Sequence, residues 1–321
     1  MIMCVQVMTS HLPDILQASC DAGHRCHLWL APDAHLNPPP TFRLRSINNR
    51  FHVHDAYEQH LRAHGLLAYS KLTSNTQKFL LDPSLMSALV DRWRPETHTF
   101  HLRCGELAPT LKDVSLITAL PIGGKPLVPT SYSSIWPLEI EDRLGFQVPP
   151  NTRRGGRPRG VPLSWLVTHF AELPANADNE TVTRHLFAYL LYLFDIMFPS
   201  SHGDVVLPSL IKIAEEIVDA PLPPNPIYSF GSAILAHTYR GLCDATQRTK
   251  LASKGHILAV SYEFLQLWSW EYIPVGRPDI VNKIHPYNYT QEEHEPLTFG
   301  SRWVHAKKRW STNVVRGCYP E

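Results

Sequence analysis

Apolar residues recur at helical spacing along most of the chain, and this pattern predicts a mainly α-helical protein. Residues 206–218 show it best, because their apolar positions fall three and four residues apart on one helix face. Residues 83–94 repeat this spacing after Asp82, which can cap a helix, and Pro83, which suits the first helical position. The other predicted helices are residues 56–69, 111–120, 161–170, 179–198, 229–246 and 256–272.

One segment follows a strand pattern instead. Residues 98–102 alternate between polar and apolar side chains, which predicts a short strand, and Leu107 begins a second one. A turn joins them, and its glycine can adopt a positive φ angle. The turn residues are Cys104, Gly105 and Glu106. The sequence therefore predicts a β-hairpin near residues 98–108.

The helix after this hairpin carries its own start signal. Thr110 and Asp113 have the spacing of a capping box, with a hydroxyl first and a carboxylate three residues later. We expect Glu106 to stabilise the preceding turn by accepting bonds from backbone amides. The residues predicted to form the buried face of the helix are Leu111, Val114 and Ile117.

Three segments lack a regular pattern. Residues 1–54 include a proline-rich stretch, and we interpret them as an irregular N-terminal extension with regular structure beginning near Asp55. Residues 125–160 are rich in proline, serine and glycine, which predicts a connector inside a domain that spans residues 55–321. The sequence from Pro274 onward is irregular again.

Composition narrows the class of protein. The six cysteines are scattered over 321 residues without the spacing of a disulfide framework, which favours reduced thiols in a cytosolic or nuclear protein. A net charge of +1 gives the whole chain no general attraction to nucleic acid or membranes. The most apolar run, residues 186–194, is far shorter than the roughly 20 residues that cross a bilayer, so we expect no membrane partner.

Two clusters of reactive side chains have a chemical and a structural interpretation. Cys104 could act as a nucleophile with His98 or His101 as its base, but we favour a turn cysteine beside strand histidines. A second cluster could bind zinc, yet its spacing matches no common zinc pattern, so we predict no metal. The residues of this second cluster are Cys20, His24, Cys26 and His27.

Basic residues suggest one further kind of partner. Four arginines lie within seven residues, and they could neutralise nucleic-acid phosphates or form a solvated linker between two helical halves. These residues are Arg153, Arg154, Arg157 and Arg159. A second basic run, residues 307–309, lies between Trp303 and Trp310, whose rings could stack on single strands or belong to the core.

Alternating aromatic residues close the last predicted helix. Trp268, Trp270 and Tyr272 cannot share one helix face. We favour core positions for the tryptophans. One of them would then pack against the tail of the chain, while the alternative is an aromatic partner surface.

Six segments in order resemble the plant mobile domain family, which is also labelled aminotransferase-like and occurs in serine/threonine-protein phosphatase 7 long form homologs. The resemblance covers residues 55–278. The segments are DRWRPETHTFHLRCGE, LKDVSLITALPIGGKPL, WLVTHF, HLFAYLLYLFDIMFP, YSFGSAILAHTYRGLC and LQLWSWEYIPVGRP.

The resemblance implies a nuclear protein of transposon origin that acts through protein partners. Members of the family are linked to meristem maintenance, transposon silencing and genome stability, and some are fused to a phosphatase domain. A phosphatase-like protein is therefore an implied partner. The family has no established catalytic residues to carry over. A transposon-encoded nucleic-acid-binding protein is the alternative function.

The family labels do not imply an enzyme here. An aminotransferase needs a lysine that binds pyridoxal phosphate beside a phosphate-binding loop, and no lysine of the chain follows an apolar strand with such a loop. A metallophosphatase needs clustered Asp, His and Asn ligands for two metals, which the sequence does not assemble. We predict no catalytic residues, no cofactor and no small-molecule substrate.

The chain departs from the family pattern at two points. Arg103 stands where the family usually has proline, and the chain ends at Glu321, earlier than is usual. These departures suggest a truncated or transposon-derived copy.

Overall fold

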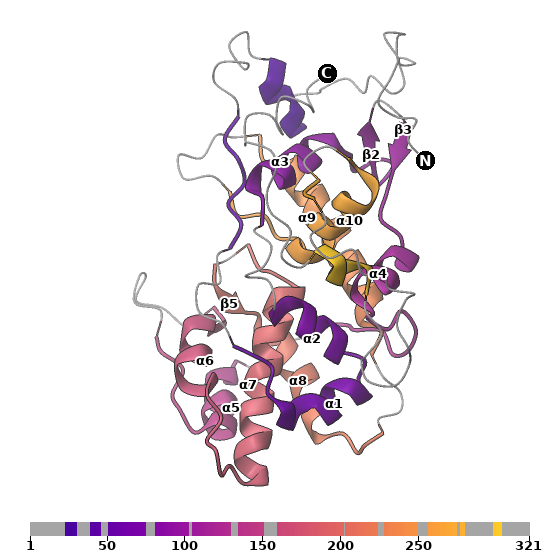
Figure 1. Ribbon diagram of the computed structural model, residues 1–321. Helices are drawn as coiled ribbons and strands as arrows, with labels where there is room; N and C mark the ends of the chain where they lie inside the picture. Colours follow the sequence, from indigo (N-terminus) through magenta and orange to yellow (C-terminus); the bar gives the residue numbers. More distant parts are fainter. Residues whose placement is uncertain are drawn as a thin grey trace, which may run out of the picture.

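The computed structural model of the chain describes residues 23–30, 39–45, 51–74, 81–102, 105–129, 134–150, 159–201, 203–223, 228–249, 256–274, 277–279 and 298–303. Within these residues the protein is mainly α-helical, as the sequence predicts, and its strands form small antiparallel sheets. Figure 1 shows the helices in two groups, one above the other.

The lower group in Figure 1 surrounds a long helix, α7, and we call it the α7 lobe. Asp178 caps α7 by accepting a hydrogen bond from the backbone N–H of Thr181, and every residue from His185 to Met197 is buried. Because α7 is buried all round from His185 onward, other helices must cover this part of it. The helices of this lobe are α1 (Glu58–Ala63), α2 (Leu67–Ser74), α5 (Trp136–Leu144), α6 (Leu163–Phe170), α7 (Asn179–Met197) and α8 (Ile211–Asp219).

The upper group, the α9 lobe, packs helices beside a three-stranded sheet (Figure 1). α9 contacts α3, α4 and the first strand, and α10 contacts α3 and α4. The elements of this lobe are α3 (Pro83–Arg92), β1 (Trp93–Arg94), β2 (Thr99–Leu102), β3 (Gly105–Leu107), α4 (Leu111–Thr118), α9 (Phe230–Thr246), α10 (Tyr262–Tyr272) and two 3-10 helices, η1 (Arg25–Leu30) and η5 (Phe299–Trp303).

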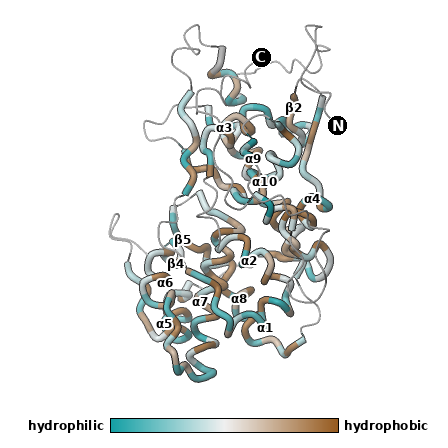
Figure 2. Tube along the Cα trace, in the orientation of Figure 1, coloured by the Kyte–Doolittle hydropathy of each residue, from teal (hydrophilic) through white to brown (hydrophobic). Residues whose placement is uncertain are grey.

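Both lobes share one continuous hydrophobic core. Figure 2 shows apolar segments in the helices of each lobe. A second small sheet pairs β4 with β5 in antiparallel fashion beside α7. The remaining elements are η2 (Asp55–Tyr57), β4 (Val161–Pro162), β5 (Val205–Val206) and η4 (Pro208–Leu210).

The predicted β-hairpin is present. β2 and β3 pair in antiparallel register, with Phe100 opposite Leu107 and His101 opposite Glu106. The sequence did not indicate β1, which adds a third strand by pairing Trp93 with Phe100. Two residues are too few to show a strand pattern.

The segment predicted to be a connector, residues 125–160, contains the helix α5, so this prediction is wrong in part. Trp136, Ile140 and Leu144 are buried and lie four residues apart, a spacing that places them on one face of a helix. Pro137 occupies the first turn, where it costs no hydrogen bond. The proline-rich and glycine-rich residues on either side hid this period.

Three helices, α6, α8 and α10, begin later than predicted because strand-like pairing takes up the residues before them. Val206 pairs with Val161 in the small sheet, so α8 begins only at Ile211, after η4. The residues before α10 bond instead to the backbone of Arg43. The N–H of Arg43 donates to the carbonyl of His256 at 2.8 Å, and the N–H of Leu258 donates to the carbonyl of Arg43 at 3.1 Å.

A glycine allows the residues before α10 to approach α9. A Cβ atom at Gly241 would lie 1.9 Å from the carbonyl oxygen of Ala259. We expect Gly241→Ala to lower the free energy of unfolding by about 1–3 kcal/mol, because the backbones must separate. Denaturant unfolding measures the loss. Gly123→Ala is the control, since nothing lies within 4 Å of its added methyl group, and equal losses in both variants would contradict the prediction.

Candidate functional site

The residues that follow the hairpin form the predicted capping box. The backbone N–H of Thr110 donates to Asp113 Oδ2 at 2.7 Å, and the N–H of Asp113 donates to Thr110 Oγ1 at 3.3 Å. The hydroxyl of Tyr272 donates to the other oxygen of Asp113. This buried carboxylate therefore starts α4 and also links it to α10, which is a structural role.

The hairpin turn is described only in part, because Arg103 and Cys104 lie outside the described residues. Gly105 has a φ angle of 120°, the positive value that favours glycine. Glu106 accepts a hydrogen bond from Thr99 Oγ1 at 2.7 Å and lies 3.8 Å from His101 Nε2. Its bonds in the described part of the chain are to cross-strand side chains. The expected bonds to backbone amides of the turn stay a prediction, because Arg103 and Cys104 are not described.

The two histidines of the hairpin have separate surroundings. His98 stacks on the ring of Tyr239, with ring centroids 5.9 Å apart. His101 Nε2 lies 3.2 Å from Thr97 Oγ1, and burial lowers the pKa of this histidine. The structure does not test a pairing of either histidine with Cys104.

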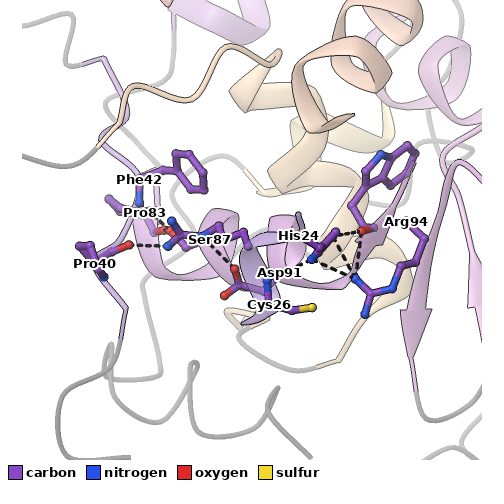
Figure 3. A network of polar contacts seen from close by, with 10 residues as sticks. His24, Cys26, Pro40, Phe42, Pro83, Ser87, Asp91 and Arg94 are labelled. Carbon is purple, nitrogen blue, oxygen red and sulfur yellow. Dashed lines mark hydrogen bonds and ion pairs between the residues drawn. The ribbon is translucent and has the colours of Figure 1, made fainter. Parts of the chain in front are cut away.

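One of the two histidines in the cluster that was weighed as a zinc site, His24, is an anchor between protein groups (Figure 3). His24 Nε2 lies 2.9 Å from the carbonyl oxygen of Trp93, and His24 Nδ1 accepts the backbone N–H of Cys26 at 3.0 Å. Burial lowers the pKa of His24, which favours the neutral ring that these two bonds need. Cys20 lies outside the described residues, and within them no group of three His, Cys, Asp or Glu side chains could hold a metal ion.

Residues near His24 attach the N-terminal segment to α3 (Figure 3). Arg25 Nε donates to Asp91 Oδ1 at 2.9 Å, and the backbone N–H of Phe42 donates to Ser87 Oγ at 2.8 Å. The guanidinium of Arg25 also lies 4.4 Å from the centre of the Phe42 ring. The 3-10 helix η1 spans Arg25–Leu30, so regular structure begins before Asp55, contrary to expectation. The domain boundary near Asp55 stays a prediction.

The basic residues proposed to bind nucleic acid lie mostly outside the described residues. Arg159 is described and exposed to solvent. The structure does not test whether this cluster meets the second basic run, residues 307–309. The undescribed members of the first cluster are Arg153, Arg154 and Arg157.

The tryptophans of α10 belong to the core, as we favoured. Trp268 and Trp270 are both buried. The ring of Trp270 lies 5.5 Å from that of Trp303, which is buried too and follows later in the chain. This contact is the packing against the tail that the sequence suggested.

One helix presents apolar side chains on both sides. Val114 and Ile117 of α4 are buried, as predicted, but Leu111 is 39% exposed and Leu116 is 37% exposed. Lys112 and Ser115 lie between these two leucines on the helix surface. We call this surface, residues 111, 112, 115 and 116, the α4 face. The sequence pattern did not indicate this face, because the spacing of Leu111 predicts a core position.

Within the described part of the chain, no helix is both long enough and apolar enough to span a bilayer.

Comparison with known proteins places these elements in a family. A model described as the plant mobile domain matches residues 68–318. A serine/threonine-protein phosphatase 7 long form homolog of Arabidopsis thaliana is 38% identical over 227 residues, which cover 70% of this chain and 16% of that protein.

Two other proteins of Arabidopsis thaliana are similar. Protein MAIN-LIKE 2 is 36% identical over 201 residues, covering 62% of this chain and 28% of that protein. Protein MAINTENANCE OF MERISTEMS is 34% identical over 207 residues, covering 64% of this chain and 41% of that protein. The chain thus spans less than half the length of these relatives, and no solved structure matches it. The family model covers most of the chain, so the protein belongs to the plant mobile domain family.

Proposed function

We propose that the chain is a non-enzymatic interaction domain of transposon origin that acts in the nucleus through protein partners. Its processes are transposon silencing, genome stability or meristem maintenance. Family membership supports this proposal, since one similar protein is named for the maintenance of meristems. A phosphatase-like protein is the first partner to test, because another similar protein carries that name.

The α4 face is the observation that carries the proposal. Its two leucines are more than one third exposed although the opposite side of the same short helix is core. Exposed apolar side chains at a rigid element are suited to contact with another protein. Lys112, exposed between the leucines, favours a partner whose apolar surface also carries a carboxylate.

The non-enzymatic part of the proposal rests on what the reactive side chains do. Lys125 donates hydrogen bonds to Glu216 at 2.8 Å and to Tyr228 at 2.9 Å, and these bonds raise its pKa. A lysine that forms a Schiff base needs the opposite shift. Asp113 and His24 likewise serve as a helix cap and an anchor.

Proximity labelling in plant cells tests the α4 face. We expect Leu116→Glu to remove a subset of the proteins labelled by the wild-type chain, because the new carboxylate must be buried against an apolar partner surface. For a purified partner the variant should bind at least about tenfold more weakly, as for truncation of an interface hot spot.

Leu138→Glu is the matched control, because Leu138 is a leucine of α5 that is 60% exposed. It should leave the labelled set unchanged. Identical labelled sets for the wild-type chain and Leu116→Glu would refute the α4 face as the binding surface. Labelling of cytoplasmic proteins alone would refute the nuclear part of the proposal.

A further inference from the structure

A buried ion pair joins the N-terminal segment to the α7 lobe. The guanidinium of Arg45 donates to Asp195 Oδ2, and the two side chains are 3% and 1% exposed. The same guanidinium donates to the backbone carbonyls of Asp195, at 3.2 Å, and of Gly203. Arg45 therefore holds the C-terminal part of α7 from outside that helix.

The segment that carries Arg45 also belongs to the other lobe. Two residues earlier, the backbone of Arg43 bonds to His256 and Leu258, which lead into α10. Residues 39–45 run between the two groups of helices in Figure 1. We call residues 39–45 the strap, since their backbone contacts the α9 lobe and their last side chain contacts the α7 lobe.

A second buried carboxyl group lies near this ion pair. Glu263, in the first turn of α10, is 5% exposed, and its Oε2 has no hydrogen-bond partner in the described part of the chain. Glu263 interacts electrostatically with both Arg45 and Asp195. Two buried carboxyl groups thus interact with one guanidinium, and of these two Asp195 is the one that forms an ion pair with it. An unpaired buried charge is costly, so a protein usually neutralises such a group by binding a proton.

The other titratable groups around Arg45, Asp195 and Glu263 do not include a second buried cation that could neutralise Glu263. Asp204 lies 3.9 Å from Arg45, but its side chain is 64% exposed. His237 of α9 is neutral near pH 7, because burial and, to a smaller extent, the charge of Arg240 lower its pKa to about 4. The remaining groups are the hydroxyls of Tyr69 from α2 and Tyr262 from α10.

Burial raises the pKa of both acids, Asp195 and Glu263. Burial raises the pKa of Glu263 to about 7 and that of Asp195 to about 7, while Arg45 opposes both shifts. We assign the neutral form to Glu263, because Asp195 is the carboxylate that accepts the hydrogen bond of Arg45.

We propose that this junction is a proton-dependent latch, in which protonated Glu263 allows the Arg45–Asp195 pair to hold the strap and both lobes together. Loss of the proton leaves Glu263 as an unpaired buried carboxylate and weakens the attachment of the strap to the two lobes. In the unfolded chain Glu263 has the ordinary pKa of a glutamate, so between that value and about pH 7 the folded chain binds one more proton. Stability from this site is complete below that range and is lost as pH rises through about 7.

Unfolding in denaturant from about pH 5 to about pH 8 tests the latch. One extra proton in the folded state lowers the folding constant by up to about tenfold per pH unit at the steepest part of the range. We expect this dependence in the wild-type chain and in Glu172→Gln, the control, because Glu172 is exposed. Glu263→Gln should show a flatter profile. A Glu263→Gln profile parallel to that of the wild-type chain would overturn the proposal.

A measurement on the wild-type chain covers the case in which Glu263→Gln does not fold. We expect the infrared band of a protonated carboxylic acid at about pH 6 and its disappearance by about pH 8. Over the same range, the protection of residues 256–261 and of the strap against amide hydrogen exchange, measured relative to the intrinsic exchange rate at each pH, should fall. Absence of that band at the lower pH, or protection that does not change, would equally refute the latch.

Discussion

Arg45→Ala is expected to lower the free energy of unfolding by about 3–5 kcal/mol, the usual cost of removing one partner from a buried ion pair. The variant leaves Asp195, which is 1% exposed, without the guanidinium that neutralises it. It also removes the donors to the backbone carbonyls of Asp195 and Gly203. Most of the loss therefore comes from polar groups that remain buried without a partner.

Denaturant unfolding near pH 8 measures this loss against a matched control. Arg62→Ala removes an arginine whose side chain is 59% exposed and which pairs with Glu58 at 3.6 Å on the same helix. An exposed pair of this kind contributes about 0–1 kcal/mol. Replacing both Arg45 and Asp195 by apolar residues should cost less than Arg45→Ala alone, since no charge stays buried. Similar losses of unfolding free energy for Arg45→Ala and Arg62→Ala would show that the buried pair stabilises the fold no more than an exposed pair does.

The sequence could not have revealed the Arg45 site. A single arginine in an irregular, proline-rich segment carries no periodic signal, and its partner Asp195 lies 150 residues away in the chain. Glu263 sits inside a helical pattern that is apolar on both sides, so only the packing of α10 shows that this carboxyl group is buried. Contacts between distant segments are set by tertiary packing, which local spacing does not encode.

Local signals predicted local structure well. The capping box of Thr110 and Asp113, the cap of α3 at Asp82 and the hairpin of β2 and β3 depend on residues a few positions apart, and each is present. The bond from Tyr272 to Asp113 spans 159 residues and was not foreseen. Asp113 therefore has two structural roles, as the cap of α4 and as the acceptor for Tyr272. Only the first of them could be predicted from neighbouring residues.

Predictions from helix periodicity were wrong at the end of one helix and within a segment rich in proline and glycine. Leu111 has the spacing of a buried residue, but it is the first residue of α4 and is exposed. In α5 the period was correct, yet the prolines and glycines around it suggested a connector. Both errors concern the ends or the surroundings of a helix, where a short pattern gives the least information.

Trp93→Ala is expected to lower the free energy of unfolding by about 3–5 kcal/mol, the range for a fully buried tryptophan replaced by alanine. Trp93 is 0% exposed, and its ring centre lies 4.9 Å from that of Phe100 and 5.0 Å from that of Tyr239. Its Nε1 donates to Cys243 Sγ at 3.2 Å. The side chain thus fills the space between the three-stranded sheet and α9, and alanine would leave a cavity there.

Trp165→Ala provides the comparison, because Trp165 is only partly buried and the rings nearest to it, those of His169 and Phe170, belong to its own helix. Its loss should be clearly smaller in denaturant unfolding. The backbone carbonyl of Trp93, which the variant retains, is also the acceptor for His24. A shift of β1 toward the new cavity would weaken this bond, so the Trp93 variant should expose residues 23–30 to proteolysis more readily than the Trp165 variant does. Equal stability losses with equal cleavage would mean that Trp93 does not connect the N-terminal segment to the core. A larger loss together with faster cleavage near residue 30 would show that this one residue couples the segment, the sheet and α9.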